Sequence, residues 1–305
     1  MITDLSARLH SVVAIPVTPF DDRGDIDLAA YADLIRRLIR SGISVITPNG
    51  GVGEFYSLSD DEASRLLETA VSTAGGRALL IPGVGHDLTS AIGAARRAEG
   101  MGVEAVMIHP PAHPRSSEDG WVAYHREIAD AVPRLGLVLY LRDAAIRPHA
   151  IRSLLETAPN VVAVKYAVAD PTRLAEMIED VGQGRLTWLC GLAELWAPFF
   201  WIAGGRGFTS GLANVRPELP LEMLARLREG DYQGAMDVWR QVHPFEAMRA
   251  RHDNANNVPV VKEALALLGI CSRRVRPPLN ELIPSEREKL RDVVKAWRGL
   301  AIDKV

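Results

Sequence analysis

Short apolar segments alternate with helical patterns along almost the whole chain, and this alternation limits the possible folds more than any other feature. Apolar runs rich in β-branched residues and bounded by turn residues predict buried parallel strands. Strands that alternate with helices form right-handed βαβ units around a parallel sheet, and eight units predict an α/β fold, the closed (β/α)8 TIM barrel. The expected strands are Val12–Val17, Ile43–Thr47, Ala78–Pro82, Val103–Ile108, Gly136–Leu141, Val161–Lys165, Leu186–Cys190 and Gly207–Ser210.

Helices are expected between these strands. Ser59 and Glu62 have the spacing of a capping box, which marks the start of a helix. An open doubly wound sheet is the alternative architecture, but no GxGxxG motif follows the first strand. The expected helices are Asp27–Ser41, Asp60–Ala74, Leu88–Met101, Asp119–Ala131, Pro148–Thr157 and Pro171–Asp180.

The last quarter of the chain is predicted to be helical. The eighth βα unit ends near Glu229, and no Pro/Gly-rich linker frees the remaining residues as a separate domain. We therefore expect residues 1–229 to form the barrel and residues 230–305 to form a C-terminal helical extension packed on it. Its helices are expected at Tyr232–Arg251, Val258–Leu268 and Pro284–Gly299, with a stiff Arg276-Pro277-Pro278-Leu279 link before the last.

Composition excludes several function classes. The 305 residues are 48% hydrophobic and 24% charged, which is ordinary for a globular protein. A net charge of −3 gives no electrostatic case for nucleic acid or an anionic membrane. The N-terminus lacks the basic segment followed by an apolar core that is typical of a signal peptide. Cys190 and Cys271 lack the spacing of a metal site or a redox motif. We expect a cytoplasmic protein without cofactor, metal, nucleic-acid partner or membrane contact.

Lys165 is the first candidate for chemistry. It ends the apolar run Val161–Val164, where an ammonium group without a partner would be costly to bury. Burial favours the neutral amine, which is a nucleophile toward carbonyl groups. The functional interpretation is a lysine that forms a Schiff base. The alternative is a strand-end lysine whose amine extends to water.

Other polar residues also follow predicted strands, where catalytic groups of barrels lie. The glycines of the Pro48–Phe55 loop allow backbone N–H groups to approach an anion, or simply make a tight turn. Tyr140 ends the fifth strand, where a phenol can carry protons or pack in the core. Arg142 can bind the carboxylate of a ligand, or it can form a local ion pair with Asp143.

Four further residues carry weaker signals. His109 and His113 have HxxxH spacing, but the prolines between them prevent a helix that would bring both onto one metal ion. Thr209 and Ser210 end the eighth strand, where they line a site or cap the strand.

Together these residues resemble the dihydrodipicolinate synthase / N-acetylneuraminate lyase family of class I aldolases and dehydratases. The resemblance runs from Ala14–Phe20 to Leu279 and includes the GGVGEF loop, Tyr140 and Lys165. It implies that Lys165 forms an imine with a 2-oxo acid such as pyruvate and that Tyr140 shuttles protons. It implies that Gly50, Gly51 and Val52 hold the substrate carboxylate through backbone N–H groups, and that the chain forms a homo-oligomer, a dimer or a tetramer.

The chain departs from the lysine-pathway synthase of that family. That enzyme carries two threonines where this chain has Gly51 and Val52, and a substrate-binding arginine where it has Ala145. The relay tyrosine from a neighbouring subunit falls near His113, which makes His113 a candidate for substrate contact. The GGVGEF and Tyr140-Leu141-Arg142-Asp143 motifs are more similar to those of the 5-dehydro-4-deoxyglucarate dehydratase branch.

The expected function is therefore a Schiff-base-forming lyase, either an aldolase or a dehydratase, acting on a 2-oxo acid. Arg142 would bind a distal carboxylate or hydroxyl of that substrate. Two alternatives remain open. One is 4-hydroxy-tetrahydrodipicolinate synthase of lysine biosynthesis, and the other is a barrel that binds a 2-oxo acid without turnover.

Overall fold

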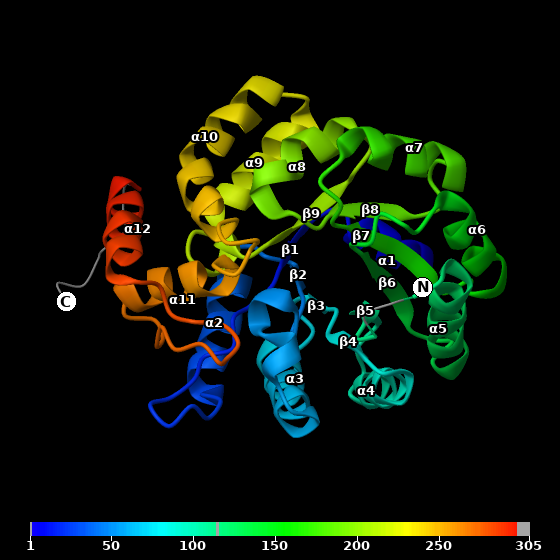
Figure 1. The fold of residues 1–305 in the computed structure, drawn as a ribbon, viewed down its shortest axis with the longest axis horizontal. Coiled ribbons are helices and arrows are strands. Elements are labelled where there is room, and N and C mark those ends of the chain that lie inside the picture. Colours follow the sequence, from blue (N-terminus) through cyan, green and yellow to red (C-terminus); the bar gives the residue numbers. More distant parts are fainter. Residues whose placement is uncertain (1, 114–115, 298–305) are drawn as a thin grey trace.

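The computed structural model describes residues 2–113 and 116–297 and shows a ring of strands wrapped by helices (Figure 1). Within the described residues, all strands of the single sheet pair in parallel, in the order β3-β2-β1-β9-β8-β7-β6-β5-β4. Their bounds are β1 Val12–Ala14, β2 Val45–Ile46, β3 Leu79–Leu80, β4 Gly83–His86, β5 Ala105–Pro111, β6 Gly136–Leu141, β7 Val161–Tyr166, β8 Thr187–Cys190 and β9 Gly207–Ser210.

The two edge strands of that order, β3 and β4, are parts of one barrel strand. Pro82 lies between them and has no N–H group to donate to a neighbouring strand. Hydrogen bonds continue across the gap, because Ile81 N donates to Ile46 O at 2.9 Å and Met107 N donates to Pro82 O at 2.9 Å. The ring therefore closes through a single chain segment, and the predicted eight-membered barrel is confirmed.

Helices follow the barrel strands in alternation (Figure 1). Ser59 caps α3 as expected: its side chain accepts from Glu62 N, and the Glu62 carboxylate accepts from Ser59 N at 2.9 Å. A short α1, Ile2–Arg8, precedes the first strand. The barrel helices are α2 Leu28–Arg40, α3 Asp60–Ala74, α4 Leu88–Gly100, α5 Glu118–Ala131, α6 Pro148–Thr157, α7 Pro171–Val181, α8 Ala193–Ile202 and α9 Glu218–Glu229.

Two apolar clusters stabilise this arrangement. The larger one lies between the strands and the surrounding helices. The smaller one joins Leu5 and Leu9, at the start of the chain, to strand residues such as Val13, Met107 and Leu189. Because alternate residues of a barrel strand point inward, this second cluster is the barrel interior, and α1 contributes to it.

Helices α10 (Tyr232–Arg249), α11 (Asn257–Leu267) and α12 (Pro284–Ala296) follow the barrel. Helix α10 packs against α8 and α9, and Trp239 Nε1 donates to Leu195 O at 2.9 Å (Figure 1). The predicted last helix reached Gly299, which lies outside the described residues. No helix of the described chain combines the length and apolarity needed to cross a membrane.

Candidate active site

Lys165 and Tyr140 lie side by side at the ends of two adjacent strands. They are register partners on β7 and β6, and Lys165 Nζ lies 3.8 Å from the centroid of the Tyr140 ring. Lys165 is only 3% exposed. This burial lowers the pKa of Lys165, while Tyr140 and Cys190 act in the opposite direction. Burial therefore shifts the balance toward the neutral, nucleophilic amine relative to an exposed lysine.

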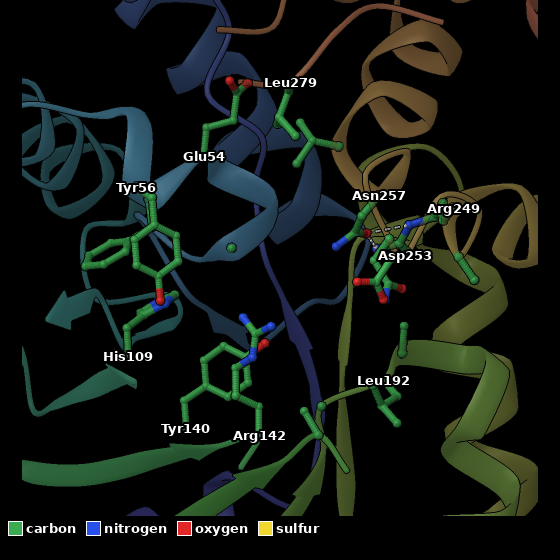
Figure 2. Close-up of a pocket in the computed structure, with 18 of the residues that line it drawn as sticks. Glu54, Tyr56, His109, Tyr140, Arg142, Leu192, Arg249, Asp253, Asn257 and Leu279 are labelled. Carbon is green, nitrogen blue, oxygen red and sulfur yellow. Dashed lines mark hydrogen bonds between the residues drawn. The ribbon is translucent and has the colours of Figure 1, made fainter. Parts of the chain in front are cut away.

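Tyr140 lines a cavity of about 490 Å³ (Figure 2). Tyr140 and Arg142 lie at its base, Tyr56 and His109 on one side, and residues of the C-terminal extension on the other. The loops after β2, β6, β7 and β8 contribute to the lining, so the cavity lies at the C-terminal ends of the strands, where barrel enzymes place their sites.

Gly191 separates Lys165 from this cavity. A Cβ atom at Gly191 would lie 2.8 Å from Ala167 Cβ and 3.1 Å from Lys165 Cγ. Lys165 itself is not among the described lining residues, whereas Tyr140 and Gly191 are. Lys165 therefore lies just below the cavity floor. Because Gly191 has no side chain, only backbone atoms of Gly191 pack on the aliphatic part of Lys165.

The glycine loop after β2 forms one tight turn. Gly51–Gly53 make a 3-10 turn, and Glu54 follows it in the left-handed region at φ 60°. A Cβ at Gly50 would lie 2.5 Å from Ile15 Cγ2, so a side chain there would clash. Gly51 lines the cavity, whereas Val52 is buried behind it. As the first residues of the turn, Gly51 and Val52 have N–H groups without a partner inside it.

Glu54 ties this loop to the C-terminal extension. Its Oε1 lies 2.5 Å from Lys262 Nζ, and both side chains are fully buried. Glu54 Oε2 accepts from Arg276 N at 2.9 Å, and Lys262 donates to Arg274 O at 2.7 Å. The carboxylate points away from the cavity (Figure 2), so Glu54 fixes the loop rather than contacting a ligand.

Arg142 is exposed to solvent and points into the cavity beside Tyr140 (Figure 2). Asp143 does not pair with it; this carboxylate accepts from Ala145 N at 2.8 Å. Arg142 also lines a second cavity of about 450 Å³, together with His113, Tyr56 and Tyr140. His113 therefore belongs to a neighbouring cavity that shares a wall with the first.

Thr209 and Ser210 are not among the described residues that line either cavity. Thr209 Oγ1 donates to Cys190 O at 3.3 Å. Ser210 donates to the Glu194 carboxylate and accepts from Ala213 N at 2.9 Å. Burial, together with nearby Glu246, raises the pKa of Glu194 to about 8.

The far wall of the cavity comes from residues that the sequence alone did not single out as site residues. Arg249, Asp253 and Asn257 face the cavity opposite Tyr56 (Figure 2). Arg249 forms a buried ion pair with Glu246 at 2.6 Å and donates to Asn257 Oδ1 at 2.6 Å. They were given no role in the site, because they lie in a predicted helical extension far from the strand ends.

His109 also lines the cavity, although its spacing to His113 first suggested a metal site. Within residues 2–113 and 116–297, no three His, Cys, Asp or Glu side chains gather closely enough to hold a metal ion. The useful signal for His109 was its position at the end of a predicted strand, the same position that marks Lys165 and Tyr140.

Comparison with known proteins matches residues 8–297 to the model of the dihydrodipicolinate synthetase family. A probable 5-dehydro-4-deoxyglucarate dehydratase of Methylobacterium radiotolerans is 32% identical, over 92% of this chain and 92% of that protein. One of Polaromonas naphthalenivorans is 28% identical, over 96% and 97%.

Solved structures agree with this match. Dihydrodipicolinate synthase from Oceanobacillus iheyensis superimposes with a TM-score of 0.94 at 36% identity, over 97% of this chain and 99% of that chain. The enzyme from Bacillus clausii gives 0.93 at 37% identity, over 96% and 99%. The resemblance in the motifs thus extends to the whole fold.

Proposed function

The chain belongs to the dihydrodipicolinate synthetase family, and on that premise we propose that it is a Schiff-base-forming lyase acting on a hydroxylated 2-oxo acid. The Lys165 amine adds to the C2 carbonyl, and loss of one water gives the imine. The protonated imine withdraws electrons, so that C3 loses a proton or a C–C bond breaks. Proton loss followed by departure of a neighbouring hydroxyl as water is a dehydration, and C–C cleavage is a retro-aldol reaction.

The observation that carries this proposal is the buried Lys165 amine next to the Tyr140 ring, beneath the cavity. Its lowered pKa makes the neutral, nucleophilic form of the amine easier to reach than in an exposed lysine. Tyr140 is the candidate proton carrier, because a positioned phenol can act as general acid and base. A barrel that only binds a 2-oxo acid would not need this pair.

The remaining predicted residues receive roles by position. The backbone N–H groups of Gly51 and Val52, shaped by Gly50, would hold the substrate carboxylate. Arg142 would bind the distal end of the substrate. His113 stays a candidate for contact from the second cavity. Thr209 and Ser210 would support the floor through their hydrogen bonds.

Borohydride trapping tests the proposal. Wild-type protein treated with pyruvate and borohydride should gain the mass of one reduced adduct on the peptide that contains Lys165. Lys165→Ala should gain none, and Lys262, which is also buried, serves as an internal control. Absence of an adduct, or an adduct on Lys262, would refute the proposal.

The lysine-pathway synthase reaction provides a second test. Gly51 and Val52 carry no hydroxyl group, and Ala145 carries no charge. Condensation of pyruvate with aspartate semialdehyde should therefore be slow, with kcat/KM well below about 10⁴ M⁻¹s⁻¹. A value at or above that level would restore the synthase alternative.

We also expect a homo-oligomer, a dimer or a tetramer, in the cytoplasm. Size-exclusion chromatography with light scattering measures the oligomeric state.

A further inference from the structure

His109 is a fully buried histidine whose two ring nitrogens both lack a hydrogen-bond partner within the described chain. Buried polar atoms are nearly always paired, because removing them from water without compensation is costly. His109 is also part of the cavity wall (Figure 2). A ligand in this cavity would therefore lie beside an imidazole whose two nitrogens form no hydrogen bond within the described chain.

The surroundings hold this imidazole in one orientation. Its ring stacks on Phe55, with centroids 4.0 Å apart and planes 11° apart. The Tyr140 ring meets it edge-on, with centroids 5.4 Å apart. Tyr56 also meets it edge-on, with centroids 5.8 Å apart. These three aromatic contacts restrict the rotation of the imidazole, so its nitrogens are held in fixed directions.

Two glycines of β4 make room for the ring. A Cβ at Gly83 would lie 2.9 Å from His109 Nε2, and a Cβ at Gly85 would lie 3.0 Å from His109 Cβ. Glycine weakens a strand and is found where another group approaches closely. The strand beside β5 is therefore shaped around His109 and Phe55.

The charges around His109 determine which ligand group it suits. Burial lowers the pKa of His109, and Lys165, His86 and Arg142 lower it further. A neutral imidazole offers one donor and one acceptor. It carries no charge to attract a carboxylate, a role that Arg142 in the same cavity fills better. A hydroxyl group, which also donates and accepts, matches it.

We propose that His109 hydrogen-bonds a substrate hydroxyl at C3 or C4, one or two carbons beyond the C2 carbon that reacts with Lys165, and so selects hydroxylated 2-oxo acids. This inference deepens the proposed function and rests on it for the position of the substrate. His109 is then a specificity-determining residue of the site.

Two pairs of ligands test the proposal, since the members of each pair differ by a hydroxyl against a methyl group. Hydroxypyruvate is compared with 2-oxobutyrate, and 4-hydroxy-2-oxobutanoate with 2-oxopentanoate. Dissociation constants come from the concentration dependence of borohydride trapping, with mass spectrometry to identify each adduct. Wild type should prefer the hydroxylated member of at least one pair by about tenfold or more.

His109→Phe keeps an aromatic ring for stacking and removes both nitrogens. This variant should bring the ratio of the dissociation constants of the methyl and hydroxyl ligands close to one. Its dissociation constant for pyruvate should stay almost unchanged. His109→Gln keeps a donor and an acceptor, should retain part of the preference, and serves if His109→Phe fails to fold. His125→Phe is the matched control, because His125 is equally buried and its Nε2 also lacks a partner in the described chain, yet it does not line the cavity.

Two outcomes would overturn the inference: no preference for either hydroxylated ligand in wild type, or an equal loss for all ligands in His109→Phe. Failure of the proposed function gives a different result, the absence of any Lys165 adduct in wild type. The pairs are then compared by calorimetry, where a hydroxyl preference that depends on His109 supports the inference and its absence overturns it.

Discussion

Tyr140 and Lys165 face each other across neighbouring strands, with the amine of one 3.8 Å from the ring centre of the other. The parallel ladder sets this distance, because register partners on adjacent strands point to the same side of the sheet. The proposed phenol and amine of the reaction therefore lie at one edge of the barrel, and both can be tested by substitution.

Replacing Tyr140 by Phe should lower turnover by about 10²- to 10⁴-fold, the usual contribution of a general acid or base. The ring and its packing against His109 remain, so the free energy of unfolding should change little. Steady-state kinetics and urea unfolding of the same preparations measure both. Near-normal turnover would assign Tyr140 to core packing and leave His113 as the next proton carrier to test.

Replacing Arg142 by Lys should weaken binding of long or dicarboxylic 2-oxo acids and leave pyruvate trapping almost unchanged. A lysine supplies a point charge in place of a two-pronged guanidinium. Asp143 is engaged by Ala145 N, so the variant breaks no Arg142–Asp143 pair. Titration calorimetry with pyruvate and 2-oxoadipate makes the comparison. An equal loss for both ligands would place Arg142 at the carboxylate that all 2-oxo acids share.

Replacing Lys262 by Met should destabilise the protein by about 3–5 kcal/mol, because Glu54 would be left charged and buried without its partner. Adding Glu54→Gln should recover part of this loss, since Gln keeps an acceptor for Arg276 N and removes the charge. Urea unfolding at one protein concentration gives the values. Arg36→Met is the control, because the exposed pair of Arg36 with Asp33 is worth at most about 1 kcal/mol. A double variant no more stable than Lys262→Met would argue against a charge effect.

Glu194 should make stability depend on pH above the usual range of a carboxyl group. Its pKa is raised from 4.5 to about 8, so between these values the folded state keeps a proton that the unfolded state has lost. The stabilisation is fully present below pH 4.5 and is lost as the pH rises through about 8. Glu194→Gln is neutral throughout, and it should gain up to about 1.4 kcal/mol per pH unit relative to wild type across this window.

Urea unfolding of both proteins at pH 5, 6.5 and 8 tests this prediction. Because both proteins share every other titrating group, the difference between them isolates Glu194. A difference in the free energy of unfolding between the two proteins that stays constant across the three pH values would show that Glu194 is ionised in the folded protein.

Local sequence was sufficient to predict the bounds of an element where turn or capping residues stand at both ends of an apolar pattern. The predicted bounds of β6, β9, α3 and α6 agree with the structure because Gly, Pro or a capping box marks their ends. Helix α8 gave no signal, since it is apolar on nearly all sides and contains Pro198. The third barrel strand was expected to end at Pro82, but it continues beyond it as β4 to His86.

The site was partly predictable for a similar reason. Lys165 and Tyr140 were found because each ends an apolar strand, and the parallel order of the barrel brings such ends together. Arg249 and Asp253 were missed because their place in the cavity depends on how the extension folds back over the barrel. No local pattern encodes that long-range contact. His109 was noted after a predicted strand, but only its spacing to His113 was considered, and it was given no role in the site.

The division of the cavity between barrel and extension separates two tasks along the gene. The codons for Lys165 and Tyr140, the proposed reacting groups, lie in the middle of the gene. Those for the lining residues of the extension, Arg249, Asp253, Asn257, Pro278 and Leu279, lie in its last fifth. Mutations in that last fifth can reshape the far wall while the β6–β7 pair stays intact. Such mutations would change the proposed substrate preference without touching Lys165 or Tyr140, provided that the buried contact of Glu54 with Lys262 is kept.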